Sequence, residues 1–141
     1  MRAPSTWRYI LTDNTAGSGD TTGLFQAQVQ DASTLDRITA AIEVTYLEPD
    51  QEAEILKSAY PAILEPLRKD MVKFAKLVRD SFKAGDIQNT MSVRGLLSWA
   101  EKIEVTGGIG DALRLSWYSK LSEDNQAKVW DMYSQVFGEK M

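Results

Sequence analysis

PAILEPLRKDMVKFAKLVRDSFKAGD, residues 61–86, carries the clearest helical pattern in the chain. Apolar side chains recur at intervals of three and four residues, with Lys and Arg between them, and they are Leu67, Met71, Phe74, Ala75, Val78 and Phe82. This spacing places them on one face of an α-helix, and Gly85 supplies a stop signal. The pattern predicts one long amphipathic helix with its apolar stripe in a core and its cations on a solvated face.

Four other segments on either side of this helix have the same period. Acidic residues in the first turn of the earliest segment suit the helix dipole, Ser92 is suited to cap another, and the glycines after Thr106 and at Gly138 provide stops. The predicted helices are PDQEAEILKSAY (49–60), SVRGLLSWAEKI (92–103), IGDALRLSWYSKL (109–121) and SEDNQAKVWDMYSQVFG (122–138). Their Met and aromatic stripes are interpreted as core.

The first third of the chain has a different pattern. WRYILT (7–12) and AIEVTYL (41–47) are rich in aromatic and β-branched residues and predict two short strands. DASTLDRIT (31–39) predicts a short helix capped by Ser33 or Asp31. The fold class expected is mainly α with a small β component, in which a β-containing N-terminal third precedes a helical region.

Composition removes several classes of function. The 141 residues include no Cys and no His, which excludes thiol catalysis, disulfides, histidine or cysteine metal sites and Ser-His or Cys-His nucleophiles. A net charge of -4 makes nucleic acid an unlikely partner, although LRKDMVKFAKLVRDSFK leaves a weaker nucleic-acid adaptor hypothesis open. No apolar run suggests a membrane span, so we expect a cytoplasmic protein without a membrane partner.

LTDNTAGSGDTTGLF, residues 11–25, looks at first like a phosphate-binding loop. Gly17, Gly19 and Gly23 do not match the G-x-G-x-x-G spacing, and no lysine follows a glycine as a Walker A loop requires. The stretch therefore predicts a turn-rich surface loop. Asn14, at the end of the first predicted strand, is placed either to orient a water beside a phosphate or to cap a turn.

Several motifs together resemble AAA+ ATPases of the MoxR and chelatase group, most of all the cobaltochelatase ATPase subunit of the CobS type. The matching segments are Asn14–Gly23, Leu35–Arg37, Tyr46–Glu52, Ser92–Arg94 and Trp99–Glu101. The resemblance implies that Asn14 is the sensor 1 residue, which positions the attacking water. It implies that Arg37 is an arginine finger for a neighbouring subunit, and that Arg94 is the sensor 2 residue of the lid.

The resemblance also implies a domain division and a set of partners. Residues 1–48 would be the C-terminal remnant of the AAA+ α/β core, with two short parallel strands, and residues 49–141 the helical lid. ATP and Mg²⁺ would serve the complete module, which forms a ring with chelatase partner subunits and drives cobalt insertion into a corrin ring or MoxR-like remodelling.

The 141 residues contain no Walker A or Walker B motif. We therefore expect this chain alone to be inactive, to bind neither ATP nor Mg²⁺ tightly, and to form a dimer through its bare strands. The alternative is a stand-alone helical protein-interaction module without ATPase activity.

Overall fold

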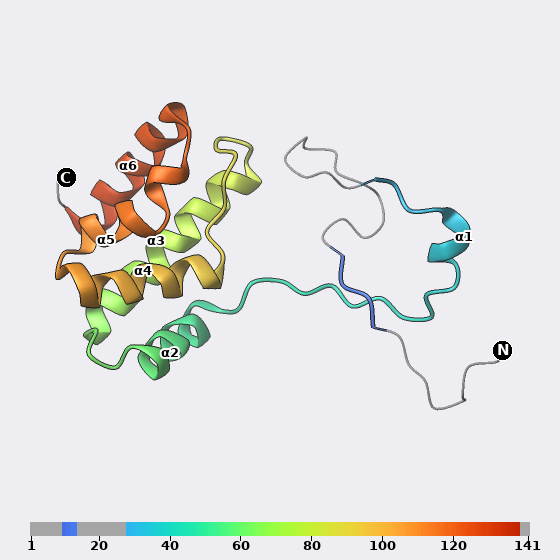
Figure 1. Ribbon diagram of the computed structural model, residues 1–141, viewed down its shortest axis with the longest axis horizontal. Helices are drawn as coiled ribbons and strands as arrows, with labels where there is room; N and C mark the ends of the chain where they lie inside the picture. Colours follow the sequence, from blue (N-terminus) through green and yellow to red (C-terminus); the bar gives the residue numbers. More distant parts are fainter. Residues whose placement is uncertain (1–9, 14–27, 139–141) are drawn as a thin grey trace. The chain divides into compact units, whose positions relative to one another are not determined.

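The computed structural model describes residues 10–13 and 28–138. Contacts divide the chain into two units, Met1–Val44 and Thr45–Met141, each of which is considered by itself (Figure 1). Asn14 and residues 7–9, the first half of the strand predicted at 7–12, lie outside the described residues, and residues 10–12 are coil. The assignment of residues 1–48 to an AAA+ core and of 49–141 to a lid remains a prediction.

In the first unit, the short helix forms but the second predicted strand does not. Helix α1 spans Ala32–Leu35, and the Asp31 carboxylate caps it by accepting from the Ser33 backbone N–H at 3.4 Å. Residues 41–47 are coil, and Ile42 and Val44 are 87% and 88% exposed. A strand needs a neighbour for its backbone, and the backbone of this segment pairs with that of no described residue. The small β component of the predicted fold class is accordingly absent from the described part of the chain.

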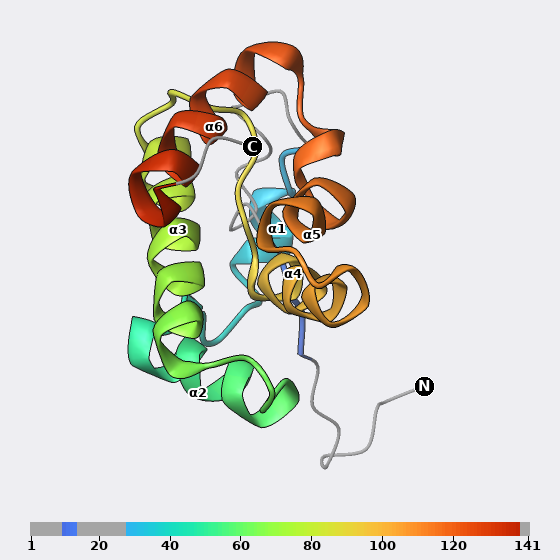
Figure 2. The same ribbon diagram turned by 90° about the vertical axis from the view of Figure 1, so that its left-hand side faces the viewer.

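The second unit is a bundle of helices arranged around α3. In Figure 2, α3 runs along the unit with α2 at one end and α6 at the other, and α4 and α5 lie together beside it. The helices are α2 (Pro49–Ala59), α3 (Glu65–Lys83), α4 (Val93–Thr106), α5 (Ile109–Ser116) and α6 (Glu123–Phe137), with a 3-10 turn at Tyr118–Lys120. No helix in the described residues is both long and apolar enough to cross a bilayer.

The core of this unit is aromatic. Phe74 of α3, Trp99 of α4 and Tyr133 of α6 are fully buried. The Phe74 ring meets Trp99 and Tyr133 edge to face, with centroids 5.4 and 6.0 Å apart, an arrangement worth about 0.5–1.5 kcal/mol per pair beyond burial alone. Met71, Ala75 and Val78 are buried as well, and Leu67 and Phe82 pack partly buried against them. The stripe predicted from the sequence is thus confirmed as core.

The ends of α4 and α6 also follow the sequence signals, whereas α5 ends at Ser116, before the end of the helix predicted at 109–121. The Ser92 hydroxyl accepts from the Gly95 backbone N–H at 3.2 Å and caps α4. Gly107 and Gly138, with φ of 72° and 69°, end α4 and α6 in the left-handed conformation that glycine adopts without strain. Because the cap fixes where α4 starts, it also fixes the position of the first-turn residue Arg94.

Candidate functional site

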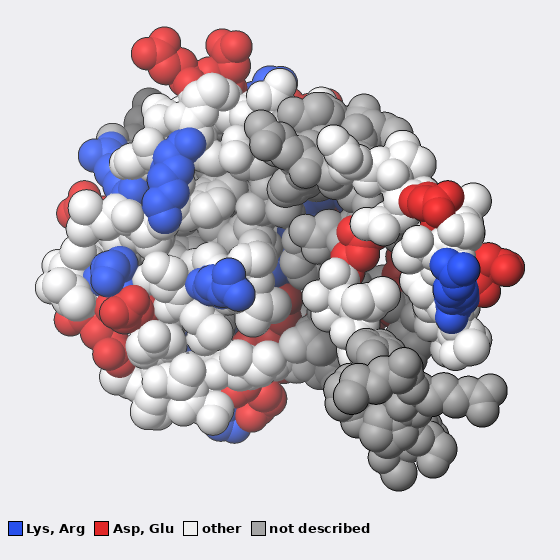
Figure 3. Space-filling model, turned by 45° about the vertical axis from the view of Figure 1, so that its right-hand side comes forward, with Lys and Arg blue, Asp and Glu red and all other residues white. Residues whose placement is uncertain are grey.

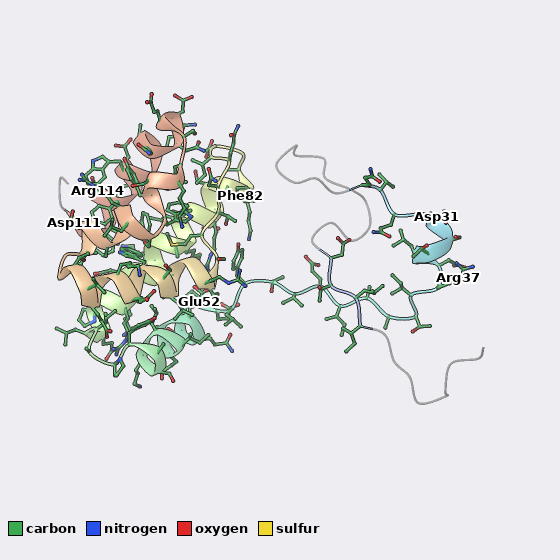
Figure 4. All side chains as sticks on the ribbon, in the orientation of Figure 1. Asp31, Arg37, Glu52, Phe82, Asp111 and Arg114 are labelled. Atoms are coloured by element: carbon green, nitrogen blue, oxygen red, sulfur yellow. The ribbon has the colours of Figure 1, made fainter. Side chains whose placement is uncertain are left out.

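The three residues singled out by the sequence have different outcomes. Asn14 lies outside the described residues. Arg37 lies two residues after the end of α1, in the turn that follows the helix, and is exposed (Figure 4). Arg94 is the second residue of α4 and is exposed too. The structure thus describes each arginine inside its own unit and does not test their roles.

Arg94 lies where an anion is favoured. The first turn of a helix presents backbone N–H groups without helical acceptors, and the helix dipole makes this end positive. Ser92 satisfies one of those donors through Gly95. Within the described residues, the Arg94 side chain makes no hydrogen bond or ion pair. Its guanidinium is therefore available to a ligand such as phosphate or carboxylate.

A second arginine, Arg79 of α3, is held inside the protein through its Nη1 and Nε, while its buried Nη2 has no hydrogen-bond partner among the described residues. Its Nη1 donates to both carboxylate oxygens of Glu52 on α2, at 2.8 and 2.9 Å. Its Nε donates to the backbone carbonyl of Met91 at 2.7 Å. The side chains of Arg79 and Glu52 are only 7% and 1% exposed. Water therefore cannot solvate either charge, and each charge is compensated by the other. Figure 4 marks Glu52 at the start of α2.

Tyr46 completes this arrangement. Its ring covers the Arg79 guanidinium at 4.1 Å from centroid to Cζ, a cation-π contact. Its hydroxyl and that of Thr90 are 3.2 Å apart and share a hydrogen bond. We call Tyr46, Glu52, Arg79 and the Met91 carbonyl the Arg79 cluster. The cluster joins α2 and α3 to two connecting segments, the one before α2 and the one before α4.

The Arg79 cluster bears directly on Arg94. Met91 is fully buried and lies just before the Ser92 cap, so its anchored carbonyl fixes the chain on which α4 begins. A hydrogen bond from a charged donor to a backbone carbonyl is stronger than a neutral one. We infer that Arg79 acts as a positioning residue for the first turn of α4.

The sequence pattern does not predict this cluster, because it places Glu52 among the first-turn acids of its helix and Arg79 among the solvated cations of the long helix. Two signals in the sequence nevertheless point to it. Tyr46 and Glu52 are the two ends of Tyr46–Glu52, one of the segments that carry the family resemblance. Arg79 lies four residues after the core residue Ala75, at the edge of the apolar stripe. A cation at that edge needs a buried partner.

The described residues give no support to two other kinds of site. No group of three or more acidic side chains among them could hold a metal ion. On the face shown in Figure 3, Lys and Arg lie in separate patches among uncharged and acidic surface, without a continuous basic area. That face offers no track for a nucleic-acid backbone.

Comparisons with known proteins agree with the resemblance in the sequence. The family model "CbbQ/NirQ/NorQ C-terminal" matches residues 52–129. The "Aerobic cobaltochelatase subunit CobS" of a Sinorhizobium species is 32% identical over 143 residues, which covers 98% of this chain and 43% of that protein. The chain thus spans less than half the length of this relative. No solved structure gives a significant match.

Proposed function

Because the chain belongs to the CbbQ/NirQ/NorQ C-terminal family, we propose that it is the sensor and lid portion of a CobS-like AAA+ ATPase. In the complete module, nucleotide hydrolysis would drive cobalt insertion into a corrin ring or, in the MoxR manner, remodelling of a partner. The 141 residues contain no Walker A or Walker B motif. The proposal therefore assigns them nucleotide sensing and subunit contact, and no hydrolysis by themselves.

The observation that carries the proposal is the placement of Arg94. It lies exposed in the capped first turn of α4, and the Arg79 cluster anchors the backbone just before it at Met91. A guanidinium held on a rigid helix start can contact a phosphate with defined geometry. Such contact would make lid position depend on the nucleotide state.

The family resemblance gives two other residues roles in the proposal, and both roles suit the chemistry of phosphoryl transfer. Arg37 would reach the nucleotide of a neighbouring subunit and stabilise the charge that develops on the transferred group. Asn14 would orient the attacking water through its side-chain amide. Both roles require a ring in which adjacent subunits share a site.

The test is a chimera with the Sinorhizobium CobS. The segment of CobS that matches this chain would be replaced by the present 141 residues. The unaltered CobS would be the reference for assembly and ATP hydrolysis. The proposal predicts that the chimera hydrolyses ATP and that the isolated chain does not. Hydrolysis by the isolated chain above background would contradict it.

A mixing experiment tests the role of Arg37. The Arg37→Ala chimera and a chimera that lacks the Walker A lysine of the upstream half should each be inactive alone. Mixed rings should recover part of the activity, because intact fingers then face intact nucleotide sites across subunit boundaries. Failure of the mixture to recover activity, while both variants assemble, would remove Arg37 from this role.

A further inference from the structure

A hollow between α2 and α3 combines an apolar lining with a basic rim. It has a volume of about 220 Å³. Its apolar surface comes from Pro49 and Ala53 at the start of α2 and from Val72 of α3, and its charged lining residues are Asp50, Lys69, Lys73 and Lys76. The three lysines are at positions i, i+4 and i+7, so they form one row along α3.

The charges around this hollow are unevenly matched. The Lys69 Nζ lies 2.6 Å from the Glu65 Oε1. Hydrogen bonding and attraction to Glu65, with a smaller contribution from Asp50, raise the pKa of Lys69. The acids near the rim thus act on the first lysine of the row. Lys73 and Lys76 make no ion pair or hydrogen bond with any described residue, although the whole chain carries a net charge of -4. These two cations thus lack a paired counter-charge within the described part of the chain.

The hollow continues into a second one that shares Pro49, Val72 and Lys76 as lining residues. The second hollow, of about 260 Å³, extends along α3 to Lys83 and is also lined by Glu48 and Asp80. The charged lining residues of the second hollow balance one another, so a polyanion that followed the groove would gain no net attraction beyond the first hollow; they are Glu48, Glu52, Lys76, Arg79, Asp80 and Lys83. The charge pattern therefore favours a short anionic segment that stops at the first hollow.

We propose that this hollow docks an acidic segment of a partner polypeptide that also carries an apolar side chain. Its carboxylates pair with Lys73 and Lys76, and its apolar side chain packs on Val72 and Ala53. Exposed ion pairs contribute little alone, so the apolar contact is needed for binding. The inference concerns α2 and α3 and is independent of whether Arg94 senses a nucleotide.

The probe is an acetylated and amidated peptide, Asp-Glu-Leu-Asp-Glu-Leu, titrated into the full ¹⁵N-labelled chain. We expect amide shifts confined to the start of α2 and to residues 69–76, with a Kd of about 0.1 mM at low salt. Added salt should weaken binding, because it screens exposed charges. An absence of shifts at about 1 mM peptide would overturn the proposal.

Matched variants separate the local charges from the net charge. Lys73→Glu with Lys76→Glu should weaken binding at least about ten-fold, through loss of the cations and repulsion of the peptide. Lys57→Glu with Lys102→Glu changes the net charge equally but lies outside the hollow, so it should leave the Kd within about two-fold. Lys73 and Lys76 are exposed, and an unchanged dispersed spectrum shows that the variant is folded. Equal weakening by both pairs would overturn the proposal.

Altered probes test the two chemical requirements. Asn-Gln-Leu-Asn-Gln-Leu lacks the acids and Asp-Glu-Gly-Asp-Glu-Gly lacks the apolar side chains, and each should bind at least about ten-fold more weakly than the first peptide. Binding of the neutral peptide with equal affinity would overturn the role of charge. A thymidine oligonucleotide that binds more tightly, with the same shifts, would replace the polypeptide with a nucleic-acid partner.

Discussion

Arg79 and Arg94 lie on either side of the connection between α3 and α4, and their surroundings differ in almost every respect. Arg79 is buried, and it bonds to a carboxylate, a backbone carbonyl and an aromatic face. Arg94 is exposed and makes no such contact among the described residues. The first is committed to the structure of the protein, whereas the second is free for a ligand.

The contrast shows that an arginine in the sequence can have one of two roles, a structural role in the core or a binding role at the surface. Arg79 is required where it is because a buried carboxylate without it would be an uncompensated charge. Arg94 contributes little to folding, because exposed side chains without partners rarely do. The substitutions that follow should therefore have large effects on stability around Arg79 and none at Arg94.

The largest effect is expected for Glu52→Ala. The change leaves the Arg79 guanidinium buried without its counter-charge, so we expect the free energy of unfolding to fall by about 3–5 kcal/mol. Urea denaturation measures this loss in the free energy of unfolding. Glu54→Ala is the matched control on the same helix, because Glu54 pairs with Lys57 at the surface at 3.1 Å and such pairs contribute about 0–1 kcal/mol. Equal losses for the two variants would show that the Arg79 cluster has no special role.

A smaller loss is expected for Tyr46→Leu. The substitution keeps apolar bulk but removes the aromatic face over Arg79, and we expect a loss of about 1–2 kcal/mol in urea denaturation. Tyr46→Phe retains the ring and removes only the hydrogen bond with Thr90, so its loss should be smaller. If Tyr46→Phe were as destabilising as Tyr46→Leu, the hydroxyl rather than the ring would hold this contact.

Ser92→Ala should cost about 1 kcal/mol, because the Gly95 backbone N–H loses its side-chain acceptor. Thermal unfolding monitored by circular dichroism measures the change. Ser92→Asp keeps an acceptor at the cap and should preserve stability. A neutral result for Ser92→Ala would mean that the Arg79 cluster alone determines where α4 begins.

The smallest effect concerns the exposed pair of Glu65 and Lys69. The hydrogen bond from Lys69, and its charge, hold the pKa of the Glu65 carboxyl below the ordinary value of 4.5. A lowered folded-state pKa means that the pair contributes stability above pH 4.5 and loses it as the pH falls through the lower value. In Lys69→Gln, an NMR titration should find the Glu65 pKa raised toward 4.5. An unchanged pKa would contradict the pairing.

The sequence predicted much of the helical unit and little of the Arg79 cluster, for physical reasons. Periodicity identifies residues such as Phe74 and Trp99, because burial repeats with the turn of the helix. Caps such as Ser92 and stops such as Gly107 are local chemistry. The pairing of Glu52 with Arg79 joins residues far apart in the chain, and neither residue type predicts burial on its own.

The predicted strand at 41–47 shows that a local sequence pattern can also predict an element that does not form. Its alternation of Ile42 and Val44 with polar residues is a good strand pattern, yet no described residue pairs with its backbone. Local pattern gives the tendency to form a strand, whereas a strand exists only beside another one. The roles of Arg37 and Arg94 came from resemblance alone, and they remain predictions.

The most direct test of the account is the Arg94→Ala substitution in the CobS chimera, with ATP hydrolysis and unfolding measured on the same samples. We expect kcat/KM to fall at least about ten-fold, with stability unchanged within about 0.5 kcal/mol. Arg114→Ala, which alters an exposed arginine of α5, is the control for hydrolysis and should leave kcat/KM unchanged. Hydrolysis by the Arg94→Ala chimera at the rate of the unsubstituted chimera would contradict the account.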